Sequence, residues 1–198
     1  MAPAETLLQL AKADLTPARL ANASLVLIDL QNEYVSGALA LREAGGAIAN
    51  AAALLARARQ AGTPVLHVAH RGRQGGMFDR AAERGAIVSQ LAPVDGEPVV
   101  EKELPNAFAK TDLESRLRQT GRKDIILVGM MTHMCVSSTA RAALDLGFRT
   151  TIDASACATR DLPDGLGGTI PARTVHEVAL AELSDRFAII VRDGRAIT

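Results

Sequence analysis

One stretch of the chain decides the fold: Lys123-Asp-Ile-Ile-Leu-Val-Gly-Met-Met-Thr-His-Met-Cys-Val-Ser-Ser-Thr-Ala140. It opens with a near-continuous apolar run of strand length, which is typical of a strand buried on both faces of a parallel sheet. Residues with helical spacing follow from Ser137 to Leu146. The stretch therefore predicts a strand, then a turn that carries Cys135, and then a helix.

The same alternation extends outward in both directions along the chain. Similar strand-like runs lie at Ser24–Ile28, Pro64–Ala69, Phe148–Asp153 and Phe187–Val191, and helical patterns lie at Ala44–Ala61, Asp112–Gln119 and Ala172–Ser184. Glycine closes several helices, as at Gly62, Gly121 and Gly147. We therefore expect one domain over residues 1–198, an α/β fold of three layers (α/β/α) with a mostly parallel central sheet. The segments Gly72–Gly76 and Leu162–Gly168 are predicted to be loops near a site.

Composition narrows the class of partner. Lys and Arg together number 22, as do Asp and Glu, so the formal net charge is zero. This balance favours neither nucleic acid nor an anionic membrane, and no apolar run approaches a membrane span. We therefore expect a small-molecule substrate. The first residues lack the apolar stretch of a secretory signal, so the two cysteines are expected to be reduced thiols in the cytoplasm.

Three reactive side chains are predicted near the carboxyl ends of strands, where open parallel sheets bind ligands. Asp29 follows the first strand, Cys135 follows the strand quoted above, and Lys102 follows the short apolar pair Val99-Val100. Each has a simpler interpretation: Asp often caps helices, Cys is often an inert buried thiol, and Lys is usually a surface charge. By position alone, Lys110 competes with Lys102.

Together these residue types point to nucleophilic catalysis. A cysteine that attacks an amide must become a thiolate, and the leaving amine needs a proton. Asp29 could take the thiol proton and deliver it onward, while Lys102 would support the negative charge. The helix predicted after Cys135 is expected to lower the pKa of its thiol.

The residues around these three side chains resemble a known family, the isochorismatase-like cysteine hydrolases. Val-Leu-Ile-Asp29-Leu-Gln31-Asn is similar to its D-x-Q-[ND] strand end, and Glu101-Lys102 followed by Ala107-Phe108 is similar to its lysine segment. The family's cysteine motif, G-x-x-T-x-x-C-V-x-x-T-A, is closely matched by Gly129-Met-Met-Thr-His-Met-Cys135-Val-x-x-Thr-Ala140. The resemblance covers about Leu25 to Val191. The family includes nicotinamidases and N-carbamoylsarcosine amidohydrolases.

The resemblance implies a role for each candidate. Asp29 would be the general base, Lys102 rather than Lys110 the charge-supporting lysine, and Cys135 the nucleophile. A cis peptide bond is implied at Met130–Met131, with the amides of Met131 and Cys135 forming an oxyanion hole. The family's members imply a homo-oligomer, a dimer or tetramer, and no cofactor is expected.

Substrate contacts and metal binding are expected from the neighbouring positions. Gln31, Tyr34, Phe108 and His133 are the candidate substrate contacts. Nicotinamidases of the family bind a metal through an Asp and several His, but no Asp lies near His67 and His70 in the second strand. We therefore expect no metal, and His67 and His70 are expected to pack or line the site.

The sequence thus predicts a hydrolase of a small amide, ureido or carbamoyl C–N bond that works through a thioester. The alternative is an isochorismatase-type enzyme, which cleaves a vinyl ether and does not need the cysteine, or a non-catalytic interaction module of the same fold. A third possibility is a redox pair of Cys135 and Cys157.

Overall fold

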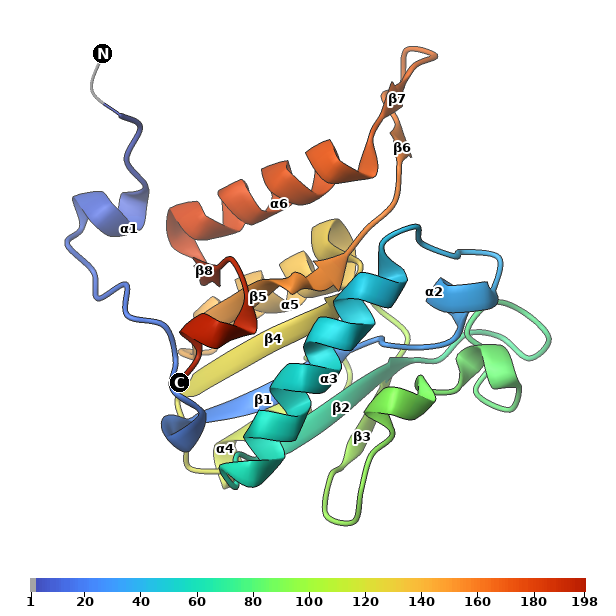
Figure 1. The fold of residues 1–198 in the computed structure, drawn as a ribbon, viewed down its shortest axis with the longest axis horizontal. Helices are drawn as coiled ribbons and strands as arrows, with labels where there is room; N and C mark the ends of the chain where they lie inside the picture. The colour runs from blue at the N-terminus through green and yellow to red at the C-terminus, as the bar shows by residue number, and fades with distance from the viewer. Residues whose placement is uncertain (1–2) are drawn as a thin grey trace.

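A six-stranded parallel sheet forms the centre of residues 3–198, the part of the chain that the computed structural model describes (Figure 1). The first two residues of the predicted domain lie outside this range. The strand order is β3-β2-β1-β4-β5-β8, and every neighbouring pair is parallel. The strands are β1 (Ala23–Ile28), β2 (Val65–His70), β3 (Val99–Lys102), β4 (Asp124–Met130), β5 (Arg149–Ala158) and β8 (Ile189–Val191).

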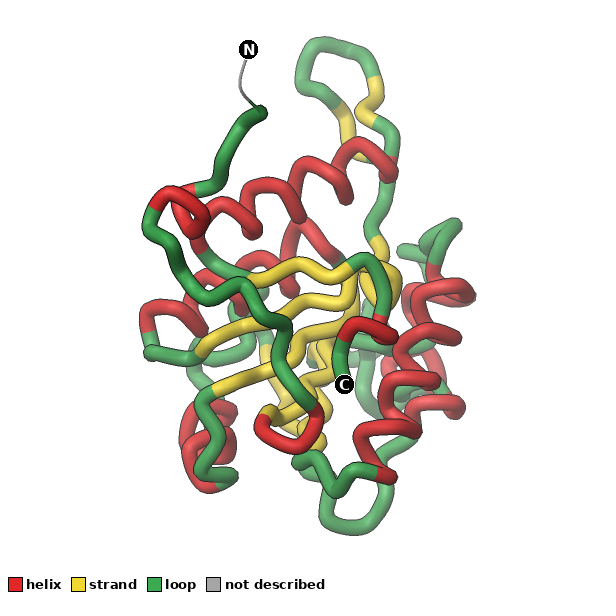
Figure 2. The backbone as a smooth tube through the Cα atoms, turned by 60° about the vertical axis from the view of Figure 1, so that its left-hand side comes forward, coloured by secondary structure: helices red, strands yellow, loops and turns green. Residues whose placement is uncertain are grey.

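Helices cover both faces of the sheet, which confirms the predicted three-layer α/β/α fold (Figure 2). Helix α3 packs on one face, and α4, α5 and α6 pack on the other. The short helices α1 and α2 lie outside these layers, and α1 contacts α6. The helices are α1 (Leu7–Leu10), α2 (Glu33–Ser36), α3 (Ala44–Gln60), α4 (Leu113–Gln119), α5 (Ser137–Asp145) and α6 (Ala172–Arg186).

Strand β1 shows why the runs are apolar throughout. Its alternate side chains point to opposite faces, so Leu25 and Leu27 join the cluster under α3 while Val26 and Ile28 join the cluster under α4, α5 and α6. All six residues of β1 are buried. A strand covered on both faces needs apolar residues at every position, and this is the pattern that the sequence analysis used.

Strand β5 is longer than predicted and continues past Asp153 to Ala158. The polar residues Asp153 and Ser155 interrupt the apolar run, which is why the sequence analysis ended the strand early. The pairing of β4 with β5 shifts register between Leu127 and Gly129 and then resumes, with Gly129 opposite Cys157. The extension brings the end of β5 beside the end of β4, close to Cys135.

The two predicted loops differ in structure. Leu162–Gly168 is partly wrong as a loop, because β6 (Leu162–Pro163) and β7 (Thr169–Ile170) pair as a small antiparallel hairpin. This hairpin projects beyond the body of the molecule (Figure 1). The Gly72–Gly76 segment is an irregular turn in which the Gly72 N–H donates to the carbonyl of Phe78 (3.0 Å). Within residues 3–198, no helix is long and apolar enough to cross a bilayer.

Candidate active site

The ends of three strands bring Asp29, Lys102 and Cys135 into contact. Lys102 Nζ lies 2.7 Å from Asp29 Oδ2 and 3.4 Å from Cys135 Sγ. Asp29 is 0% exposed, Lys102 1% and Cys135 5%. Strand β3 lies two strands from β1, so the long Lys102 side chain reaches past the end of β2 to make this pair. Lys110, the competing lysine, is exposed.

Asp29 sits at the point where the chain leaves β1. Its N–H still donates to the Val68 carbonyl (2.9 Å), but its φ is +51°. Positive φ is uncommon for a residue with a side chain and is found at functional sites, where the surrounding structure must hold it. Here the conformation aligns the residue with the carboxyl ends of the strands and aims its carboxylate at Lys102.

Cys135 lies in a single π-helical turn, Thr132–Val136, that leads into α5. Such turns are rare in proteins, and those that occur are often found at functional sites. The Met131 carbonyl accepts from the Met134 and Val136 amides (3.0 and 3.3 Å). The Met130–Met131 peptide bond is cis, as the resemblance implied.

The pKa of Cys135 shifts in the direction opposite to the one expected from the sequence. Burial raises the pKa of this thiol to about 12, and the nearby Asp29 charge adds to the rise, while Lys102 opposes it. The sequence-based expectation of a lowered pKa took into account the start of the helix. It did not take into account the loss of water around the sulfur, which destabilises the thiolate. The thiol is therefore neutral at rest.

Burial also raises the pKa of Asp29, although Lys102 opposes the shift. The carboxylate thereby becomes a stronger base than an exposed aspartate. A base with a raised pKa is better matched to a thiol proton. The site thus places a carboxyl group of raised pKa and a lysine next to a thiol of raised pKa.

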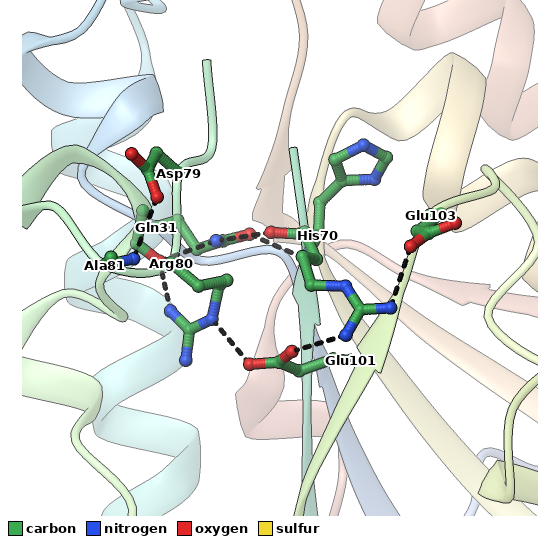
Figure 3. Close-up of polar contacts among 9 residues, drawn as sticks. Gln31, His70, Asp79, Arg80, Ala81, Glu101 and Glu103 are labelled. Carbon is green, nitrogen blue, oxygen red and sulfur yellow. Dashed lines mark hydrogen bonds and ion pairs between the residues drawn. The ribbon is translucent and has the colours of Figure 1, made fainter. Parts of the chain in front are cut away.

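Gln31 uses its whole amide to join β1, β2 and the following loop. Its Nε2 donates to the carbonyls of His70 (3.0 Å) and Gly85 (2.8 Å), and its Oε1 accepts from the His70 N–H (2.8 Å). Figure 3 shows this link between Gln31 and His70. Gln31 is fully buried. The amide that was expected to contact substrate is therefore occupied by backbone groups, which gives Gln31 a structural role.

Charged side chains on the outer side of β3 hold the adjacent loop. Glu101 lies 3.1 Å from Arg80 Nε and 3.6 Å from Arg71 Nη1, and Glu103 lies 2.7 Å from Arg71 Nη2 (Figure 3). The side chains of Glu101 and Lys102 point to opposite faces because successive residues alternate in a strand. The same short strand therefore holds the loop with one face and supplies Lys102 to the site with the other.

Tyr34 and Phe78 form an aromatic wall beside the site. Their ring centroids are 5.1 Å apart, and Phe78 lies at the same distance from the His70 ring. Burial raises the pKa of the Tyr34 hydroxyl, and the Asp29 charge adds to the rise. The buried Glu33 carboxylate holds Phe78 by accepting from its N–H (3.2 Å) and also pairs with Arg84 (3.1 Å).

Phe108 does not join this wall. Its ring stacks on Phe148, with centroids 5.9 Å apart and planes 13° from parallel. Phe148 directly precedes the first residue of β5, so the stack lies toward the amino end of that strand, opposite the end where Cys135 is found. The expectation that Phe108 forms a substrate wall is corrected: its ring is half-buried against the core.

His133 and two cavities border the site. His133 Nδ1 lies 2.5 Å from Thr159 Oγ1, and Thr132 Oγ1 lies 2.9 Å from His176 Nδ1. Thr159 and His176 line a cavity of about 900 Å³ between α3, β5 and the start of α6. A second cavity, of about 930 Å³, is lined by His70, Glu103 and residues 71–78.

The remaining histidine of β2 has a separate partner. His67 Nε2 lies 2.9 Å from Glu97 Oε2, and Glu97 also pairs with Arg59 (2.8 Å). Among residues 3–198, no three His, Cys, Asp or Glu side chains are grouped so that they could hold a metal ion. Cys157 and Cys135 are both free thiols.

Comparisons with known proteins identify the family of the chain. Residues 23–193 match the isochorismatase domain family. An isochorismatase of known structure from Pseudomonas putida KT2440 is 41% identical, with a TM-score of 0.94 over 99% of this chain and 100% of that one. The secreted isochorismatase effector Isc1 of Verticillium dahliae is 37% identical over 84% of this chain and 86% of its own length. A streptothricin hydrolase of Streptomyces noursei is 35% identical over 85% of this chain and 62% of its own length. The chain belongs to the isochorismatase family.

Proposed function

We propose that the protein is a cysteine-dependent hydrolase of a small amide, ureido or carbamoyl C–N bond. Asp29 is the general base, Lys102 supports negative charge and Cys135 is the nucleophile. The 2.7 Å contact between Lys102 and Asp29 and the 3.4 Å contact between Lys102 and Cys135 carry this proposal. A buried thiol that merely fills the core needs neither a carboxylate nor an ammonium beside it.

The first half-reaction forms a thioester. Asp29 takes the Cys135 proton as the sulfur attacks the carbonyl carbon of the substrate, and the amides of Met131 and Cys135 hold the resulting oxyanion. The tetrahedral intermediate then collapses and the C–N bond breaks. The nitrogen leaves with the proton that Asp29 received, as ammonia when the substrate is a primary amide.

The second half-reaction releases the acid. Water gives one proton to Asp29 and attacks the thioester carbonyl, and the C–S bond breaks. Asp29 returns its proton to the sulfur, so the free thiol and the carboxylic acid product are formed. Lys102 offsets the negative charge that moves between the carboxylate and the sulfur.

The names of further relatives support C–N hydrolysis. A nicotinamidase 3 of Arabidopsis thaliana and a maleamate amidohydrolase of Pseudomonas putida both match the chain. The aromatic wall and the two cavities of roughly 900 Å³ suit a small molecule. Tyr34 and His133 are the substrate contacts that we retain from the sequence. The free thiols favour a reducing compartment, so we place the enzyme in the cytoplasm, although one relative is named as secreted.

An ammonia-release screen over small primary amides, ureides and carbamoyl compounds tests the reaction. With an active substrate in hand, Cys135→Ala is expected to lower kcat by at least about 10³-fold, because the substituted enzyme has lost its nucleophile. Cys157→Ala is the matched control, since it also removes a buried thiol, and it should keep wild-type turnover. Mass spectrometry of quenched reactions should find the acyl group on Cys135.

Retention of hydrolysis by a folded Cys135→Ala variant would overturn the proposal. Hydrolysis of a vinyl ether by that variant would favour the isochorismatase-type alternative. Wild-type protein that releases no ammonia from any compound would favour the interaction module. The predicted dimer or tetramer is tested separately by light scattering of the purified protein.

A further inference from the structure

The Lys102 ammonium meets three acceptors. Besides Asp29 Oδ2 at 2.7 Å and Cys135 Sγ at 3.4 Å, it lies 3.3 Å from His70 Nδ1. An ammonium has three N–H donors and no acceptor, and Lys102 is almost fully buried. A buried donor without a partner is costly. Two of the contacts, with His70 Nδ1 and Cys135 Sγ, are hydrogen bonds, and the third, with Asp29, is an ion pair; His70 is the partner that the proposed chemistry does not use.

This contact fixes the protonation of His70. The ammonium has no lone pair, so His70 Nδ1 must accept, and the proton of the neutral imidazole lies on Nε2. Burial lowers the pKa of His70, and the Lys102 charge lowers it further, while the charges of Asp29 and Glu103 oppose the shift. His70 is therefore mostly neutral at pH 7.

Both the backbone and the ring of His70 are held in place. Its N–H and carbonyl are bound by the buried amide of Gln31, and its ring packs edge-on against Phe78 at 5.1 Å. Phe78 has a φ of +58° and is tied to Glu33 through its N–H. The imidazole thus has little freedom to turn away from Lys102, even though it also lines the 930 Å³ cavity.

We propose that His70 is a positioning residue, whose Nδ1 takes one N–H of Lys102 and so directs the other two at Asp29 and Cys135. The role belongs to the site described under the proposed function and rests on it. Without an acceptor at this position, the ammonium can turn so that its N–H groups no longer face both reacting partners. The proton transfer and the charge support would then be misaligned.

Three substitutions separate this role from others. In His70→Asn, the side-chain Oδ1 can occupy nearly the same place as the Nδ1 of histidine. In His70→Gln, the Oε1 lies nearer to the place of Nε2. His70→Phe keeps an aromatic ring but has no acceptor. We expect His70→Phe and His70→Gln to lower kcat by about 10-fold to 100-fold, the scale of a misplaced catalytic group, with a smaller change in KM. His70→Asn should restore most of the loss.

The pH profile gives a second readout. Protonation of His70 removes the acceptor and places a positive charge against Lys102. The other charged or titratable groups nearby are Asp29 after β1, Glu103 after β3 and Cys135 on the π-helical turn. The wild-type kcat/KM should therefore fall at low pH through the loss of both neutral His70 and ionised Asp29. In His70→Asn only the contribution of Asp29 remains, so the acid limb should become shallower.

Alkylation of Cys135 provides a test that needs no substrate. At pH 9, the rate of iodoacetamide labelling, followed by mass spectrometry, should fall several-fold in His70→Phe and His70→Gln, because a misdirected Lys102 stabilises the thiolate less. The rate in His70→Asn should stay near that of wild type. If the wild type hydrolyses nothing, the proposed function fails, and this series still decides the role of His70.

Equal labelling rates and equal kcat in wild type and His70→Phe would overturn the inference. Rescue by His70→Gln as complete as that by His70→Asn would also overturn it, because the important nitrogen would then be Nε2, on the cavity side. A loss confined to KM would show that His70 contacts substrate and does not orient Lys102. If His70→Phe does not fold, the Asn and Gln variants alone decide between these outcomes.

Discussion

Asp29 and Asp153 are two buried carboxylates with different surroundings. Both are 0% exposed, and burial raises the pKa of each. Asp29 forms an ion pair with an ammonium, whereas Asp153 Oδ1 accepts from the backbone and hydroxyl of Ser155 (3.0 and 2.8 Å). Burial and a raised pKa therefore do not identify a catalytic acid; the groups in contact with it do.

The largest difference is expected in turnover. Asp29→Asn keeps the shape of the side chain but removes the base, so kcat should fall by about 10²-fold to 10⁴-fold, the usual contribution of a positioned acid or base. Asp153→Asn makes the same chemical change at the other carboxylate and should leave kcat within about twofold. Steady-state kinetics on the substrate found in the ammonia screen measure both.

An Asp29→Asn variant with near-wild-type kcat would show that another group takes the thiol proton. A large loss in Asp153→Asn, with the fold intact by circular dichroism, would show that the two carboxylates are coupled. Either result would break the distinction drawn above.

The next largest effect is expected in stability. Lys102→Met leaves the Asp29 carboxylate buried without its cation and should lower the free energy of unfolding by about 3–5 kcal/mol at pH 7. The loss should shrink at low pH, where Asp29 accepts a proton and no charge is left uncompensated. Urea denaturation at several pH values measures this.

Two comparisons support the interpretation of that loss. Lys110→Met removes an exposed lysine and should change the free energy of unfolding by less than about 0.5 kcal/mol. The double variant Lys102→Met/Asp29→Asn should regain part of the stability lost by Lys102→Met, because both charges are then gone. A double variant no more stable than the single one would mean that the lysine acts through packing of its stem.

The smallest effect is expected at Asp153, and its sign follows from the pKa. The folded-state pKa lies above the unfolded value, so the wild type loses stability as the pH rises from the ordinary aspartate range through the raised value. An asparagine does not titrate. Asp153→Asn should therefore gain on the order of 1 kcal/mol relative to wild type at pH 7. The gain should vanish in acid, and thermal denaturation across pH would detect it.

The sequence predicted the positions that depend on local pattern. Strands β1 and β4 are continuous apolar runs, so Asp29 and the Cys135 turn could be placed at their ends. Lys102 could not be separated from Lys110 by pattern, because a lysine in a short strand resembles a surface charge; the family resemblance favoured Lys102. Its burial and its contacts with the other two residues come from the structure.

Features that depend on distant contacts were missed or predicted wrongly. The partnership of His70 with Lys102 follows from the parallel register of β2 and β3, in which His70 is opposite Lys102. Phe108 was misplaced because its ring turns toward Phe148. The direction of the Cys135 pKa shift was wrong because the solvent excluded by neighbouring elements is not visible in a local motif.

The protonated state of Cys135 has a consequence for the lifetime of the enzyme. Peroxide and other oxidants react with thiolates and much more slowly with thiols. In the proposed mechanism Cys135 gives up its proton only when a carbonyl is in place, so its sulfur is shielded from such damage while the site is empty. Cys135 is therefore expected to react with peroxide more slowly than an exposed thiolate does.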